Sequence, residues 1–160
     1  MKYRRLSLEE LEELQDDFIR FLAANQVTAS DWEDLKKAKP EKAEALIELF
    51  SDTVFEDVLS KVQYMEYKTP KDIKTFHCRE DKIHLLGLMV EGESSVDFTR
   101  DQTAQDMRDL LQNSQASLKM YSAEKNYKSS REEELFRMLE HGCLISQEGD
   151  LYKLLNSIAR

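Results

Sequence analysis

The pattern of apolar residues divides the chain into three parts. Apolar side chains recur every three or four positions over about residues 7–61, alternate over about residues 62–98, and mix both patterns over about residues 99–160. The first spacing is typical of a helix with one buried face, and the second is typical of strands. The pattern therefore predicts an α+β fold with an N-terminal three-helix group, a central antiparallel β-meander of three to five strands, and C-terminal helices packing on it. No repeat or linker interrupts the pattern, so we expect residues 1–160 to form a single domain.

Capping residues and one proline mark the starts of the three N-terminal helices. Ser7 and Ser30 are each followed three residues later by a glutamate, which is the spacing of a capping box. We therefore expect the first helix over about residues 7–25 and a short second helix after Ser30. Pro40 suits the first position of the third helix, over about residues 40–61, because that position needs no backbone N–H.

Three strands are predicted in the middle of the chain, at residues 64–69, 73–78 and 83–90. Pro70, Lys71 and Asp72 are predicted to form the first turn, and a tight second turn sets His77 opposite His84 in an antiparallel pair. The third strand is apolar on both faces, which places it inside the sheet. Gly87 within this strand indicates a bulge or a close backbone approach.

Shorter elements follow the third strand. Residues 91–95 are expected to form a loop, and residues 96–98 and 116–122 are predicted as further strands. A helix through Met107 ends near Asn113, and another begins after Ser130 and stops at Gly142. A last short helix covers residues 151–158.

The formal net charge of −9 is spread unevenly along the chain. Residues 1–60 hold 15 acidic and 8 basic residues, whereas residues 61–100 hold seven of each. DNA- and RNA-binding proteins gain most of their affinity by neutralising phosphates, so this balance disfavours nucleic acid as a partner but leaves a local basic patch open. The first basic residues have no apolar run behind them, so we expect no signal peptide, and no apolar run is long enough to cross a membrane. We therefore expect a soluble cytoplasmic protein with no membrane partner.

The two cysteines and three histidines lie in two places: His77, Cys78 and His84 in the hairpin, and His141 and Cys143 after a late helix. Zinc requires three or four converging ligands, but neighbouring strand residues point to opposite faces, and no paired-cysteine spacing is present. We therefore expect no metal and no cofactor. His77 and His84 form a candidate histidine pair, in which each ring lowers the pKa of the other. The two cysteines are expected to be structural thiols, since a histidine nearby in sequence does not place a base at the sulfur.

Residues 119–131 form the most basic stretch of the chain, with four bases against Glu124 alone and two tyrosines between them. Bases interleaved with aromatic rings hold phosphates and stack on nucleobases. Lys68, Lys71 and Lys74 would extend this surface if their strands are neighbours. The alternative is an ordinary solvated surface with part-buried tyrosines. The candidate anion- or partner-binding residues are Lys119, Tyr121, Lys125, Tyr127, Lys128 and Arg131.

Catalytic motifs are missing from the sequence. The acidic runs at residues 12–13, 16–17 and 132–134 are expected on helix surfaces or first turns, where no apolar setting raises a carboxyl pKa for acid catalysis. The chain has no glycine-rich phosphate loop, no HExxH and no GxSxG, and it has only four glycines. The sequence therefore assigns no catalytic residue.

Five segments carry a resemblance to a known family: KYRRL at residues 2–6, DW at 31–32, PEKAEALIELFSD at 40–52, YSAEK at 121–125 and REEELFRMLEHG at 131–142. Together they resemble an uncharacterised family of small cytoplasmic proteins from Bacteroidota, catalogued as a domain of unknown function. The resemblance runs along nearly the whole chain and implies a single domain. It implies no activity and assigns no functional residues.

These observations favour a non-enzymatic cytoplasmic interaction protein, an adaptor or regulator whose partner is another protein. The alternative is a small enzyme or a nucleotide- or RNA-binding protein that uses residues 119–131. An enzyme predicts a deep pocket where the histidines meet Lys or Tyr side chains, whereas an adaptor predicts an exposed apolar patch.

Overall fold

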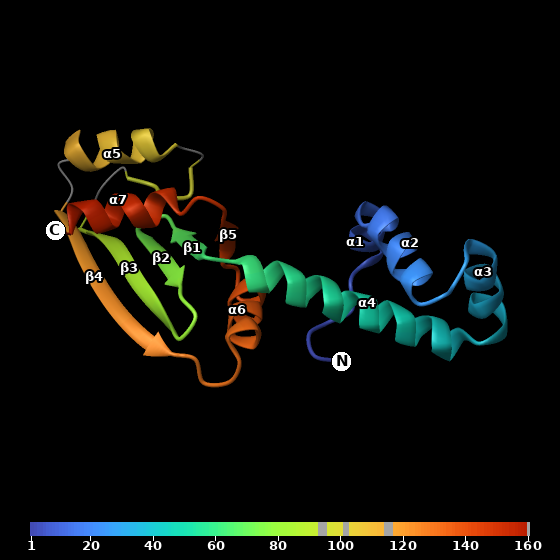
Figure 1. Ribbon diagram of the computed structural model, residues 1–160. Helices are drawn as coiled ribbons and strands as arrows, with labels where there is room; N and C mark the ends of the chain where they lie inside the picture. Colours follow the sequence, from blue (N-terminus) through green and yellow to red (C-terminus); the bar gives the residue numbers. More distant parts are fainter. Residues whose placement is uncertain (93–95, 101–102, 114–116, 160) are drawn as a thin grey trace. The chain divides into compact units, whose positions relative to one another are not determined.

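The computed structural model describes residues 1–92, 96–100, 103–113 and 117–159, which fall into two compact units, Met1–Ser60 and Lys61–Arg160 (Figure 1). The boundary lies where the helical pattern of the sequence gives way to strands. The predicted α+β class is confirmed, with N-terminal helices, an antiparallel sheet and C-terminal helices. The organisation as a single domain stays a prediction. No helix in the described ranges is both long and apolar enough to span a bilayer.

The first unit is built from helices α1 (Leu8–Glu13), α2 (Gln15–Ala24), α3 (Ala29–Ala38) and α4 (Pro40–Lys61), the last of which ends in the first residue of the second unit. Aromatic rings hold these helices together: Phe18 lies 5.2 Å from Trp32 and 4.9 Å from Phe50, between ring centroids. The N-terminal segment packs on α4, where the backbone N–H of Leu6 donates to the buried hydroxyl of Ser51 at 3.0 Å.

Two predicted helix boundaries in this unit are wrong. The single helix expected over residues 7–25 is broken at Leu14 into α1 and α2. A continuous helix would place like charges four residues apart at Glu12–Asp16 and Glu13–Asp17, which is destabilising, whereas a new start puts two aspartates in a favourable first turn. The capping box of α3 is formed by Thr28 and Asp31, not by Ser30. The capping box at Ser7 is confirmed.

The second unit contains a five-stranded antiparallel sheet. Its strands are β1 (Tyr64–Thr69), β2 (Asp72–Cys78), β3 (Lys82–Glu91), β4 (Ser117–Asn126) and β5 (Leu144–Ser146), in the spatial order β4-β3-β2-β1-β5. The apolar strand β3 lies inside the sheet as predicted, and His77 pairs with His84. Strand β5 was not predicted, because its three residues are too few to show an alternating pattern.

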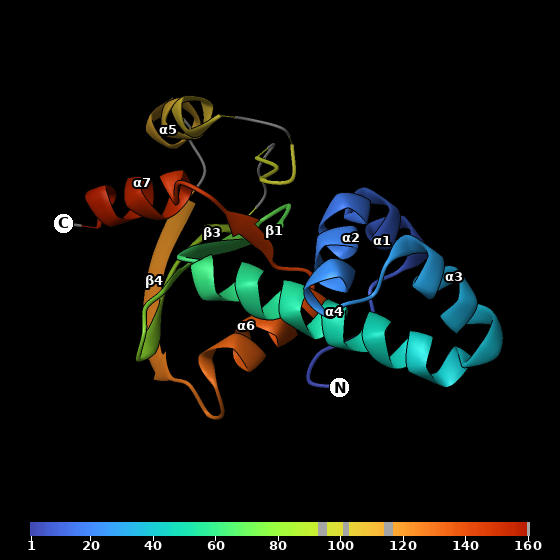
Figure 2. The ribbon, with the colours of Figure 1, turned by 45° about the vertical axis from the view of Figure 1, so that its right-hand side comes forward.

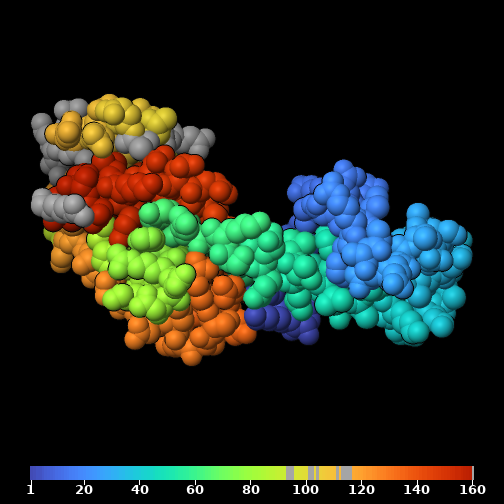
Figure 3. All heavy atoms as spheres, in the orientation of Figure 1, coloured from blue at the N-terminus to red at the C-terminus, as the bar shows by residue number. Residues whose placement is uncertain are grey.

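Helices cover both faces of this sheet. One face carries Ile73, Leu86 and Leu88, and it packs against α7 (Asp150–Ile158), with α5 (Ala104–Asn113) on the outer side of α7 (Figures 1 and 3). Helix α6 (Arg131–Glu140) lies on the opposite side of the sheet from α7, as Figure 2 also shows. Both predicted ends of α6 are confirmed, because the Ser130 hydroxyl caps its start and Gly142 follows its end with a φ of +102°.

Several predictions after β3 need correction. Residues 96–98 form no strand; instead Val96 and Phe98 are buried in the core, and the N–H of Phe98 donates to the carbonyl of Pro70 at 3.0 Å. The expected loop at 91–95 begins one residue late, because Glu91 still belongs to β3, and residues 93–95 lie outside the described part of the chain. The strand expected at 116–122 is β4, which extends to Asn126; residue 116 lies outside the described ranges.

Candidate functional site

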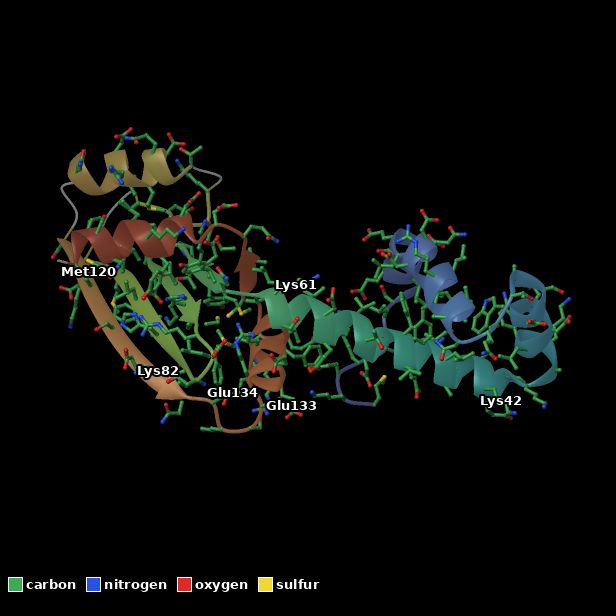
Figure 4. The ribbon with its side chains drawn as sticks, in the orientation of Figure 1. Lys42, Lys61, Lys82, Met120, Glu133 and Glu134 are labelled. Atoms are coloured by element: carbon green, nitrogen blue, oxygen red, sulfur yellow. The ribbon has the colours of Figure 1, made fainter. Side chains whose placement is uncertain are left out.

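Strand β4, which contains most of the predicted basic stretch, forms one edge of the sheet. It pairs along its whole length with β3, and no other strand among the described residues pairs with its outer side. Figure 4 labels Met120 near one end of this strand pair and Lys82 at the other. With ten residues, β4 is a long edge, whereas the opposite edge, β5, has only three.

The hydrogen bonds of β3 fix which backbone groups of β4 point outward. Val90 N–H donates to the Lys71 carbonyl at 2.8 Å, and Arg79 N–H donates to the Lys82 carbonyl at 3.0 Å. Even-numbered residues of β3 therefore bond to β2, and odd-numbered ones bond to β4, since these directions alternate in an antiparallel pair. The odd-numbered residues of β4 are their partners. The outward N–H and C=O groups consequently belong to the even-numbered residues Leu118, Met120, Ser122, Glu124 and Asn126.

Tyr121 lies across Gly87 of β3. A Cβ atom on Gly87 would lie 2.0 Å from Cζ of this ring, so the ring occupies the space that any other residue would fill. The predicted close approach at Gly87 is therefore made by a side chain and not by a backbone. The Tyr121 hydroxyl donates to Oδ1 of Asp72 at 2.5 Å, and Lys74 Nζ lies 5.7 Å from the ring centroid. Burial and the bond to Asp72 raise the pKa of Tyr121, which keeps this hydroxyl a donor.

Tyr127 and Arg131, near the C-terminal end of the basic stretch, bind the β2–β3 turn. The Tyr127 hydroxyl donates to the Arg79 carbonyl at 2.6 Å, and burial raises the pKa of Tyr127 to about 12. The Arg131 guanidinium donates to the carbonyls of Arg79 and Cys78, each at 3.1 Å, and also to that of Val62. These two side chains therefore have structural partners inside the unit.

Glu134, labelled with Glu133 at the start of α6 in Figure 4, is buried. The expectation that residues 132–134 lie on the surface is wrong for this one, because its side chain turns under the loop that follows β4. One carboxylate oxygen accepts the backbone N–H of Lys128, and the other lies 3.0 Å from Lys125 Nζ. Burial alone would raise the pKa of Glu134, but these two donors bring it below its ordinary value.

The six residues of the basic stretch therefore do not form one basic patch. Lys119 and the side chain of Lys128 are exposed on the surface, whereas Lys125 pairs with a buried acid. Of the three lysines near the first turn only Lys74 reaches the stretch, since Lys68 lies 3.6 Å from Glu66 and Lys71 donates to the Val96 carbonyl.

The candidate histidine pair lies beneath α7 in a cluster of rings. His77 stacks on Tyr64 with ring centroids 4.8 Å apart, and His84 Nδ1 lies 2.5 Å from the Tyr152 hydroxyl. Burial, together with the nearby charges of Arg79, His84 and Lys153, lowers the pKa of His77. Sequence reasoning missed Tyr152, because this residue approaches the sheet only once α7 has docked on it, whereas the register of β1 and β2 places Tyr64 opposite His77. The packing of rings indicates a structural role for the cluster.

The two cysteines are free thiols. Cys78 is 3% exposed, and burial raises the pKa of its thiol to about 12; burial also raises the pKa of Cys143. Both sulfurs are therefore protonated at neutral pH, which disfavours nucleophilic attack. Within the described residues, no group of three or more His, Cys, Asp or Glu side chains is placed to hold a metal ion.

Comparison with known proteins gives a family and no activity. No curated protein and no solved structure matches the chain. One family, described as a family of unknown function (DUF6495), matches residues 1–160. This match confirms the resemblance to an uncharacterised family over the whole chain: the protein belongs to the family of unknown function DUF6495.

Proposed function

We propose that this protein is a non-enzymatic cytoplasmic interaction protein, an adaptor or regulator, and that its partner adds an extended segment to the outer edge of β4. The supporting observation is a ten-residue edge strand whose even-numbered residues direct their N–H and C=O groups away from the sheet. Such an edge is a template for another strand, because main-chain hydrogen bonds supply affinity while alternate side chains supply specificity.

The side chains of β4 indicate the chemistry of the segment. A strand added antiparallel to β4 places each side chain beside its cross-strand partner on the same face of the sheet. On one face it meets Lys119 and Tyr121, and on the other it meets the half-buried Leu118 and Met120. The proposed partner segment therefore alternates acidic and apolar residues.

The other features of the unit fit a binding role better than catalysis. The protonated thiols are poor nucleophiles, and the two histidines are packed against tyrosine rings. Two free cysteines suit a reducing compartment, which supports a cytoplasmic location. We further propose that the protein comes from a member of the Bacteroidota, as the resemblance of its sequence implies. Binding of a nucleotide or RNA to residues 119–131 has less support, because Tyr127 and Arg131 are occupied by backbone carbonyls.

Proline substitution on β4 tests this proposal. Ser122 is exposed, and its N–H points outward, so Ser122→Pro removes one outward donor without removing a bond to β3. Ser122→Ala is the matched control, because it changes the side chain and keeps the N–H. Circular dichroism checks that both variants stay folded.

The ligand for this test is a ten-residue peptide of alternating Glu and Val, matched to the length of β4, and a Lys–Val peptide is its charge-reversed control. Fluorescence anisotropy of the labelled peptide gives its Kd. We expect binding of the Glu–Val peptide only, weakened about fivefold or more by Ser122→Pro, since a lost hydrogen bond and a clash both oppose pairing. Binding of neither peptide, or equal binding to the Pro and Ala variants, would show that the lysines of β4 merely protect a bare edge.

A further inference from the structure

A second feature of the sheet unit, separate from the edge of β4, is a cavity between α6 and the sheet. Its volume is about 300 Å³, and all its lining residues lie between positions 76 and 143. This volume is at the lower end of the range for pockets that bind small molecules. Two basic side chains of its lining, Lys125 and Arg137, are each more than half exposed to solvent.

The lining of the cavity combines apolar and basic side chains. Phe76 of β2, Ile83 of β3 and Met138 of α6 supply apolar surface, and Lys125 and Arg137 supply positive charge. Apolar surface excludes water and holds a hydrocarbon group, and a charged group beside it selects the ligand's polar end. This combination fits an amphipathic ligand better than a purely polar one.

The balance of charge in the cavity decides the sign of the ligand. Glu134 is the acidic residue of the lining. Its negative charge is already compensated by the Lys125 ammonium group and by the backbone N–H of Lys128. Arg137 donates to the Ser129 hydroxyl at 2.8 Å and lies 4.0 Å from Glu133, a long ion pair that solvent weakens. A guanidinium has five N–H donors, so Arg137 keeps donors for a further acceptor. The lining therefore has one positive charge in excess.

The dipole of α6 opposes this charge but does not reverse it. Arg137 and His141 lie in the last turn and at the C-cap of α6, where the helix dipole amounts to roughly half a negative charge. One full guanidinium charge outweighs that partial charge. His141 contributes a polar ring to the same end of the helix, with its Nδ1 2.7 Å from the Arg137 carbonyl.

We propose that this cavity binds a small amphipathic monoanion, with an aromatic or branched aliphatic group against Phe76, Ile83 and Met138 and a single acidic group on Arg137. The ligand class is that of a hydrophobic carboxylic or sulfonic acid. Its binding does not depend on a partner strand at β4.

Two matched dyes test the proposal on the full chain. 8-Anilinonaphthalene-1-sulfonate carries one sulfonate on an aromatic body, and N-phenyl-1-naphthylamine is the same body without the charge. We expect the sulfonate to bind more tightly, and Arg137→Gln to raise its Kd about tenfold, the loss expected for a charged hydrogen bond. Lys128→Gln removes the same charge from a neighbouring side chain outside the cavity lining and should change the Kd less than about twofold.

Alkylation of Cys143 locates the bound dye in the unmodified protein, so this measurement does not depend on whether a variant folds. Cys143 lines the cavity, whereas Cys78 is buried in the core. At a sulfonate concentration about ten times its Kd, alkylation of Cys143 by iodoacetamide should slow about tenfold, as read by mass spectrometry. Unchanged alkylation, equal binding of the two dyes, or a Kd unaffected by Arg137→Gln would each overturn the proposal.

Discussion

Replacement of Gly87 by alanine should destabilise the protein, although strand propensity predicts the opposite. Glycine inside a strand costs roughly 0.5–1 kcal/mol relative to alanine, so the substitution alone would be stabilising. In this sheet, however, an alanine Cβ would lie 2.0, 2.3 and 2.5 Å from three atoms of the Tyr121 ring. The aromatic ring is rigid, so the whole Tyr121 side chain must rotate away from the sheet.

The loss can be estimated from what the ring contacts. Moving it breaks the hydrogen bond to Asp72, worth about 1.5 kcal/mol for a half-buried bond to a charged acceptor, and the contact with Lys74, worth about 0.5 kcal/mol. After the gain from alanine is subtracted, Gly87→Ala should lower the free energy of unfolding by about 1–1.5 kcal/mol.

Urea denaturation followed by circular dichroism measures this change. In a Tyr121→Ala background the clash is absent, and Gly87→Ala should then stabilise the protein by about 0.5–1 kcal/mol. The two substitutions should therefore show a coupling of about 2 kcal/mol in a double-mutant cycle. A Gly87→Ala protein as stable as the parent, with no coupling to Tyr121, would refute this account of the sheet.

Three further predictions concern buried polar groups. The pKa of His77 is lowered from 6.5 in the folded protein, so the unfolded state binds more protons in acid; the free energy of unfolding should fall as pH drops below about 6.5, and His77→Phe should flatten this dependence in denaturation series at several pH values. Arg131→Met should cost about 2–3 kcal/mol by removing the Arg131 donors from the Cys78 and Val62 carbonyls, against less than about 1 kcal/mol for Arg137→Met, as measured in urea. Glu134→Gln keeps an acceptor for the Lys128 N–H and should cost about 1–2 kcal/mol, whereas Glu134→Ala loses this bond as well and should cost more; thermal denaturation ranks the two variants.

The alternating pattern of the sequence was sufficient to predict the three central strands, because alternation is a local property, but it missed β5 and gave a false strand at residues 96–98. The pairing of His77 with His84 follows from a short turn and the length of the strands, and both are visible in the sequence. The break at Leu14 was not predicted, because the apolar spacing continues through it. The acids four residues apart on either side disfavour a continuous helix, but this effect is weaker than the apolar pattern that the prediction used.

The chemistry of the basic stretch was harder to predict, because it depends on contacts distant in sequence. The sequence around Arg131 is typical of a surface base, but the fold places two carbonyls of the β2–β3 turn within hydrogen-bond distance of its guanidinium. The sequence around Glu134 is typical of an exposed acid in the first turn of a helix, but the loop after β4 covers this side chain in the folded protein. The alternation of residues 117–126 suggested a strand, but only the sheet order shows that this strand is an edge.

Backbone amide exchange of β4 tests the central claim most directly. In the protein alone, the inward amides of Lys119, Tyr121 and Ala123 should exchange slowly and the outward amides of Met120 and Ser122 quickly, because only the first set bonds to β3. Addition of the Glu–Val peptide should slow the outward amides and leave the inward ones unchanged in two-dimensional NMR spectra. Peptide binding that protects amides elsewhere, with Met120 and Ser122 still exchanging quickly, would contradict strand addition at this edge.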